Sequence, residues 1–175
     1  AIHYNDSLVI KVDLETLDSS IIASADVGDG ELIMHPTGIA FDKVNKRLIV
    51  TSEGTGATHT IRIIAIDIES KKRQVLYSPD IGSGELINIP TSLVLDSTGK
   101  YAYTFSAYSK FIRLDLDSAE RTVVSGASQG NGVALSGISS IAISADNNLL
   151  YATSYDLESL LLIDNKSGDR VILSK

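Results

Sequence analysis

The chain has 175 residues, 43% of them hydrophobic and 21% charged, an ordinary composition for a globular protein with a buried core. It carries 15 basic and 22 acidic residues, a net charge of −7, and its densest basic stretch is only Lys71-Lys72-Arg73. This excludes a nucleic-acid partner, because phosphate backbones are bound by clustered basic side chains. The absence of cysteine excludes disulfides, thiolate metal sites and a cysteine nucleophile. No apolar stretch approaches the ~20 residues that span a bilayer.

In chain order, the first predicted elements are short strands. Residues 1–5 have the pattern of a strand's tail, and residues 8–13 and 20–24 predict two further strands rich in Val and Ile. From there the same succession of four strand types, A to D, recurs. Type A lies at 35–42, 89–96 and 137–144, type B at 47–52, 101–106 and 149–154, type C at 8–13, 62–67, 110–115 and 159–164, and type D at 20–24, 74–78, 122–125 and 170–174.

The repeat has a period of about fifty residues, since the type A segments end at Asp42, Asp96 and Ser144. Every type C segment ends in an aspartate, which we expect to cap a polar turn by accepting backbone N–H bonds. These aspartates are Asp13, Asp67, Asp115 and Asp164. A Gly-x-Gly pair precedes each type A segment, first at Gly28 and Gly30. We interpret these pairs as tight turns rather than as calcium or dinucleotide loops.

Four antiparallel strands per repeat predict an all-β fold, a β-propeller of four-stranded antiparallel blades. The chain would form a single partial propeller domain, 1–175, of about three and a half blades. The half blade is 1–27, and the full blades are 36–80, 90–126 and 138–175. A partial ring exposes apolar flanks and a strand edge. We therefore expect self-association, as a homodimer, or a missing remainder of a longer propeller.

Several segments in the last two repeats resemble NHL-type propellers, most closely the exported or surface-attached bacterial versions. They are 121–125, 130–132, 138–143, 162–164 and 168–174. The resemblance covers almost the whole chain and implies an extracytoplasmic location, periplasmic or secreted. Any signal peptide is expected to have been removed or to lie outside this sequence.

This resemblance implies a fold more than a function, because such propellers include binding scaffolds, lactonases and lyases. The gluconolactonase-like members hold a divalent metal in the central channel with Glu, Asn and Asp side chains. Their motif does not match this chain residue by residue, so no metal ligand is carried over.

Ligands of propellers usually bind at the axis, on the face formed by the D–A and B–C loops, as the resemblance implies. Six candidate ligand-binding residues lie in these loops: His35, Glu53, Asn88, Tyr108, Tyr155 and Asp156. Oxygen and imidazole donors suit a cation or a polar ligand; the alternative is that they are polar loop residues at a funnel mouth. No catalytic residue is assigned, because no serine lies in a Gly-x-Ser-x-Gly elbow and the histidines lack metal-ligand spacing.

Tyrosines are frequent around the later type B segments: Tyr101, Tyr103, Tyr108, Tyr151 and Tyr155. We expect them to pack between blades, with the hydroxyl reaching water or a partner, rather than to stack on sugars.

Two functions stay open from the sequence. The first is a non-catalytic propeller scaffold for ligand or protein binding, exported, without a cofactor, and assembling into a ring by self-association. The alternative is part of a metal-dependent hydrolase or lyase of the NHL/gluconolactonase-like class, using a divalent metal. Turnover of lactones or esters would favour the second, as would a metal held by His35, Glu53, Asn88 or Asp156.

Overall fold

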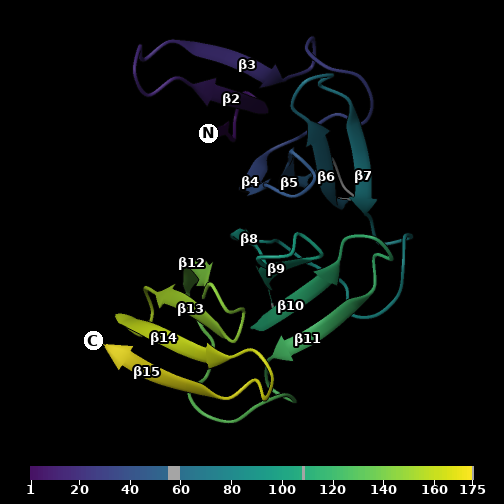
Figure 1. The fold of residues 1–175 in the computed structure, drawn as a ribbon. Helices are drawn as coiled ribbons and strands as arrows, with labels where there is room; N and C mark the ends of the chain where they lie inside the picture. Colours follow the sequence, from purple (N-terminus) through teal and green to yellow (C-terminus); the bar gives the residue numbers. More distant parts are fainter. Residues whose placement is uncertain (55–59, 108, 175) are drawn as a thin grey trace. The chain divides into compact units, whose positions relative to one another are not determined.

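The computed structural model describes residues 1–54, 60–107 and 109–174, and the secondary structure of these residues consists of strands and turns (Figure 1). In this part of the chain there is no helix that could cross a membrane. The strands form one three-stranded and three four-stranded antiparallel sheets, each in sequential order. The predicted all-β fold of four-stranded antiparallel units, with one incomplete unit, is confirmed.

The strand bounds follow the repeat. The first sheet contains β1 (Ile2–His3), β2 (Leu8–Val12) and β3 (Ser19–Ala23), and the second contains β4 (Pro36–Asp42), β5 (Arg47–Glu53), β6 (Ile61–Asp67) and β7 (Arg73–Tyr77). The third contains β8 (Leu93–Leu95), β9 (Tyr101–Ser106), β10 (Lys110–Asp115) and β11 (Arg121–Ser125), and the fourth contains β12 (Ile138–Ile143), β13 (Leu149–Ser154), β14 (Ser159–Asp164) and β15 (Arg170–Ser174).

Strand β8 is shorter than the predicted segment 89–96, since its regular pairing with β9 begins only at Leu93. Before it, Thr91 N donates to Phe105 O at 3.2 Å. The carbonyl of Ser92 accepts a bond from the Thr104 hydroxyl, 2.6 Å away, so a side chain contributes to this join between β8 and β9.

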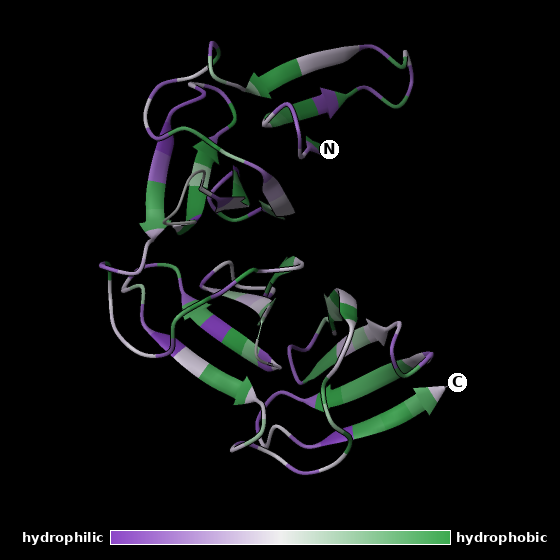
Figure 2. Cartoon of the chain, turned by 180° about the vertical axis from the view of Figure 1, so that it is seen from behind, coloured by the Kyte–Doolittle hydropathy of each residue, from purple (hydrophilic) through white to green (hydrophobic). Residues whose placement is uncertain are grey.

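The chain divides into two compact units, residues 1–81 and 82–175. In the first unit, sheets β1–β3 and β4–β7 share one core, formed by Val9, Ile22, Ala23, Ile33, Val50, Ile64 and Ile66. Ile64 and Ile66 lie on the same face of β6, because successive strand residues point to opposite faces. Figure 2 shows the corresponding pattern, with hydrophobic strands joined by largely hydrophilic turns.

In the second unit, Tyr103, Phe105 and Phe111 of sheet β8–β11 pack against Ile141 and Leu161 of sheet β12–β15. The Tyr103 ring is only 3% exposed, and its hydroxyl accepts a hydrogen bond from Asn165 Nδ2 at 3.0 Å. For Tyr103, the predicted role of a tyrosine packed between blades is confirmed.

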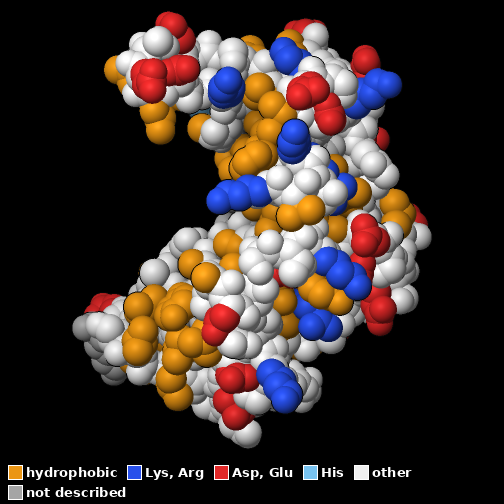
Figure 3. All heavy atoms as spheres, in the orientation of Figure 1, with side chains coloured by type: hydrophobic (Ala, Val, Ile, Leu, Met, Phe, Trp, Pro, Cys, Tyr) orange, Lys and Arg blue, Asp and Glu red, His pale blue; other side chains and the backbone are white. Residues whose placement is uncertain are grey.

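The opposite face of sheet β12–β15 is apolar but less covered. Tyr151, Leu162 and Val171 are cross-strand neighbours there, and Val171 is 54% exposed. Figure 3 shows hydrophobic side chains gathered over this sheet, at the lower left.

A buried arginine begins the last strand of each four-stranded sheet and bonds the connector that leads into that sheet. Arg73 donates to the carbonyls of Ser24 (2.7 Å) and Gly28 (2.8 Å), on the connector before β4. Arg121 donates to Glu85 O, and Arg170 to Val133 O, each at 2.8 Å. The positive φ of the connector glycines, +89° at Gly28 and +101° at Gly30, bears out their interpretation as tight turns.

The aspartates at the ends of type C strands cap the following turns, as predicted. Asp13 Oδ1 accepts from the N–H groups of Glu15 (2.9 Å) and Thr16 (3.0 Å), and Asp164 Oδ1 does the same for Lys166 (2.9 Å) and Ser167 (2.7 Å). These backbone bonds stabilise the charged carboxylate, so the pKa values of Asp13 and Asp164 lie below the ordinary value.

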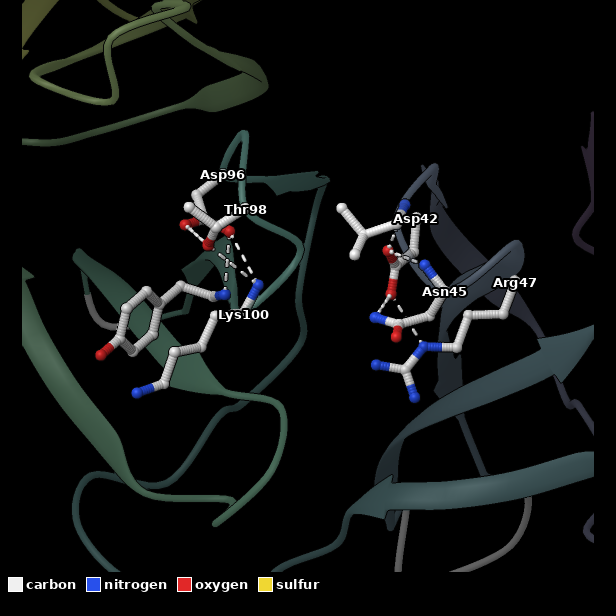
Figure 4. Close-up of polar contacts among 8 residues, drawn as sticks. Asp42, Asn45, Arg47, Asp96, Thr98 and Lys100 are labelled. Carbon is white, nitrogen blue, oxygen red and sulfur yellow. Dashed lines mark hydrogen bonds and ion pairs between the residues drawn. The ribbon is translucent and has the colours of Figure 1, made fainter.

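A second set of aspartates closes the turns after the type A strands (Figure 4). The buried Asp42 carboxylate accepts from Asn45 Nδ2 and from Arg47 Nε, both at 2.8 Å. Burial raises the pKa of Asp42, but these bonds and the Arg47 charge outweigh it, so the pKa is lowered overall. At the corresponding turn, Asp96 accepts from the backbone N–H groups of Lys100 and Tyr101, each at 3.0 Å.

Candidate functional site

The loops that carry the predicted site residues are fixed by a serine at the end of each type B strand. Ser52 Oγ accepts from Met34 N at 2.9 Å and donates to Met34 O at 3.0 Å. Ser106 makes the same two bonds with Asn88, and Ser154 donates to Ser136 O at 2.6 Å. All three serines are buried. These hydroxyls therefore close loops.

The first residue of each predicted type A segment has a left-handed backbone. Its φ is +46° at His35, +43° at Ile89 and +57° at Gly137. This conformation is easy for glycine and costly for a β-branched residue. The three loops thus keep one backbone shape although their residues differ.

In the first unit, two predicted site residues lie together. The Glu53 N–H lies 3.4 Å from the His35 carbonyl, which joins the ends of their two loops. Tyr4 links the side chains: its ring stacks on the His35 imidazole with centroids 4.7 Å apart, and its hydroxyl donates to Glu53 Oε2 at 3.1 Å. The hydrogen bond to the Glu53 carboxylate raises the pKa of Tyr4, because it holds the phenol proton.

Tyr4 was not predicted as a site residue. The register explains its position, since Ile2 pairs with Val9 as Thr51 pairs with Ile63. Tyr4 therefore follows β1 where Glu53 ends β5. In the sequence, the position of Tyr4 was indicated only by aligning the incomplete first repeat with the second repeat.

In the second unit, Asp156 accepts a short hydrogen bond from the Ser136 hydroxyl. A Cβ at Gly137 would lie 2.8 Å from Asp156 N, so only glycine fits between these two loops. Tyr155 is 71% exposed, and its N–H donates to Gly137 O at 3.0 Å. Asp156 is thus engaged within its own loop pair.

The remaining two predicted residues are less informative. Asn88 contributes its backbone to the Ser106 bonds, and its amide lies 3.5 Å from Leu86 O. Tyr108 lies outside the described residues. Among the predicted site residues, then, the structure brings together His35 and Glu53, whereas Asp156 and its sequence neighbour Tyr155 contact the loop of Ser136 and Gly137.

The His35, Glu53 and Tyr4 group offers a stacked aromatic pair beside a carboxylate. Such a group can contact a hydroxyl-bearing or cationic ligand through the carboxylate and the ring face. Among residues 1–54, 60–107 and 109–174, no three His, Asp or Glu side chains gather in a group that could hold a metal ion.

A cavity with a volume of about 510 Å³ lies in the first unit, and Gly54, the residue after Glu53, is part of its lining. It is lined by Leu32 and Met34 of the connector before β4, by Gly54 and Thr60, and by Glu31 and Arg62. Neither Glu31 nor Arg62 was among the predicted site residues. A sequence signal for Glu31 and Arg62 did exist: Glu85 and Lys110 occupy the same two positions one repeat later, so a pair of opposite charges recurs.

No protein-family model and no curated protein matches the sequence. Solved structures do match. A chain of Kuenenia stuttgartiensis hydrazine synthase is similar with a TM-score of 0.60 and 18% identity, over 96% of this chain and 44% of that one. The beta-propeller domain of Myceliophteria thermophila Cps50 (Swd1) is similar with a TM-score of 0.55 and 19% identity, over 80% of this chain and 43% of that one.

This chain spans less than half the length of either matched chain. At these identities the likeness concerns the fold and not the activity. Together with the succession of antiparallel four-stranded sheets, it shows that the chain has a β-propeller fold.

Proposed function

We propose that the chain is a non-catalytic propeller scaffold for ligand or protein binding that assembles into a ring by self-association. The observation that carries the proposal is the apolar outer face of sheet β12–β15. It has the composition of a face between blades, but no described sheet of the second unit covers it.

The repeat allows a direct comparison within the second unit. Tyr103 and Phe111 face the next sheet and are 3% and 0% exposed. Their counterparts one repeat later, Tyr151 and Leu160, are only partly buried, and Val171 beside them is 54% exposed. Apolar faces of this kind are usual at protein interfaces.

A second copy is the occupant that we propose. In the first unit, the face of sheet β1–β3 turned away from its core carries Val12 and Ile21, which are about as exposed, at 42% and 40%. An apolar sheet face at each end of the repeat series supports a head-to-tail contact, and two such contacts would close a ring with twofold symmetry.

Binding rather than catalysis is supported by the use of the polar loop residues. The buried serines bond loop backbone, Asp156 bonds Ser136, and Glu53 bonds Tyr4. The group of Tyr4, His35 and Glu53 is the ligand-binding surface that we propose in the first unit. The proposal of export rests on the resemblance to exported NHL-type propellers.

The test is the absolute mass in solution, by light scattering on a sizing column at several concentrations. We expect twice the 18.7 kDa of one chain. The variant Val171→Lys should give single chains. The control Leu86→Lys should not, because Leu86 lies on a connector and is similarly exposed, at 46% against 54%. A wild-type monomer at all concentrations, or equal effects of both variants, would overturn the assembly. Turnover of lactones or esters by the pure protein would overturn the non-catalytic assignment.

A further inference from the structure

The cavity of about 510 Å³ in the first unit has a size typical of small-molecule sites, which span about 300–1,000 Å³. Its wall is made by the connector before β4, by Gly54 and Thr60 at the two ends of the long β5–β6 connection, and by Arg62 of β6. All of these residues belong to one compact unit.

Two opposite charges lie together in this wall. Arg62 Nε is 3.5 Å from Glu31 Oε1, and both side chains are partly exposed. The next repeat has the same pair in a tighter form, with Lys110 Nζ 2.7 Å from Glu85 Oε1. The two pairs are similarly exposed, at 30% and 41% for Arg62 and Glu31 and at 29% and 37% for Lys110 and Glu85. Only the first pair lies in the wall of the 510 Å³ cavity, where a ligand can reach both charges.

Arg62 also differs from the other arginines of the fold. Arg73, Arg121 and Arg170 each donate several hydrogen bonds to connector carbonyls. Among the described residues, Glu31 is the polar partner that the structure gives to Arg62. A guanidinium has five N–H donors in a planar fork that matches a carboxylate. Arg62 therefore has N–H donors beyond its contact with Glu31, and its side chain lines the cavity and is 30% exposed.

The charges on the wall select a class of ligand. A simple anion would meet Glu31 and the net charge of −7, and a simple cation would meet Arg62. A zwitterion with its two charges on neighbouring atoms satisfies both side chains without adding net charge. The free α-amino acids have this arrangement. Leu32 and Met34 add apolar surface to the same cavity for a hydrophobic side chain.

We propose that this cavity binds a free α-amino acid with an apolar side chain. The carboxylate pairs with Arg62, the ammonium group pairs with Glu31, and the side chain packs on Leu32 and Met34. The site is independent of the ring assembly proposed above, because every contact comes from the first unit of one chain.

The test is calorimetric titration of the full chain with L-leucine to about 10 mM, which detects even millimolar binding. Three probes resemble leucine in part: 4-methylpentanoate lacks the ammonium group, 3-methylbutylamine lacks the carboxylate, and the dipeptide Gly-Leu separates the two charges. We expect leucine to bind at least about tenfold more tightly than each of them, the scale of one charge-assisted pair. No binding of leucine, or equal binding of any of the three, would overturn the proposal.

The matched variants are Arg62→Gln and Lys110→Gln. Each breaks an ion pair with a glutamate, but only Arg62 lines the proposed cavity. Arg62→Gln should weaken leucine binding at least about tenfold, and Lys110→Gln should leave it unchanged. Thermal melts of both variants check that the fold is intact. Equal weakening by both, with both folded, would show that the ion pairs act on the fold and would overturn the site.

Discussion

The strained backbone at Ile89 predicts that glycine is more stabilising than alanine at this position, the reverse of the usual order. Ile89 has φ of +43°, precedes Pro90 and is 61% exposed. The left-handed conformation costs an L-residue about 1–2 kcal/mol, and a following proline disfavours the helical region further. In ordinary strands and helices, glycine is about 0.5–1 kcal/mol less stable than alanine. At position 89 the strain relieved by glycine exceeds that penalty.

We therefore compare Ile89→Gly with Ile89→Ala, since both variants lose the same isoleucine contacts apart from one Cβ. The glycine variant should be the more stable by about 1 kcal/mol, the difference between the two effects. In a protein of this length, that corresponds to a melting temperature about 2–4 °C higher.

The assay is a thermal melt of the two variants side by side, followed by circular dichroism. Gly137, at the same position of the next repeat, is the control. There Gly137→Ala should be strongly destabilising, because its Cβ would also meet Asp156. An alanine variant at position 89 as stable as the glycine variant would refute the reasoning, since it would mean that the backbone there carries no strain.

Three further outcomes follow from the structure. Arg170→Met should lower the free energy of unfolding by about 3 kcal/mol, because it leaves Val133 O and other acceptors without their donors. Urea unfolding measures the change, and a loss below about 1 kcal/mol would contradict the prediction. Asp42 has a lowered folded-state pKa, so its stabilisation is present above the unfolded-state pKa and is lost as the pH falls toward the folded-state value. Asp42→Asn should therefore reduce the loss of stability on acidification in that window. If the stability of the variant falls with pH as steeply as that of the wild type, the Asp42 carboxylate does not stabilise the fold. Glu53→Gln should lower the pKa of Tyr4, because it removes the carboxylate that holds the phenol proton. Absorbance should then show one tyrosine ionising at lower pH, and an unchanged titration would show that the Tyr4–Glu53 bond is absent in solution.

The repeated connections of this fold show how one side chain can serve each blade. The buried arginines are 48 and 49 residues apart, and each bonds the connector that leads into its own sheet. Ser52, next to the end of β5, and Ser106 and Ser154, at the ends of β9 and β13, each bond the residue 18 positions earlier. Such residues recur because each blade needs the same loop closure, so their repetition indicates architecture rather than catalysis.

Much of the fold was predictable from the sequence, because strand alternation, turn residues and a fifty-residue period are local signals. They located every sheet and the turn-capping role of residues such as Asp13. The length of β8 was not predictable, since the join before it includes a hydroxyl bond from Thr104 on the neighbouring strand, which the local pattern does not reveal. His35 and Glu53 were named from their loop positions. Their association through Tyr4 required the register of the incomplete first sheet.

The sequence by itself determined the class of fold, the order of the strands and the turns, because these follow from the spacing of apolar, glycine and aspartate residues along the chain. Only the tertiary structure decided which charges meet. Arg73 and Arg62 have the same side chain, yet one is buried against connector carbonyls and the other faces a cavity beside Glu31. Strand period and turn chemistry are properties of neighbours in sequence, whereas burial and the partner of a charge depend on segments that only folding brings together.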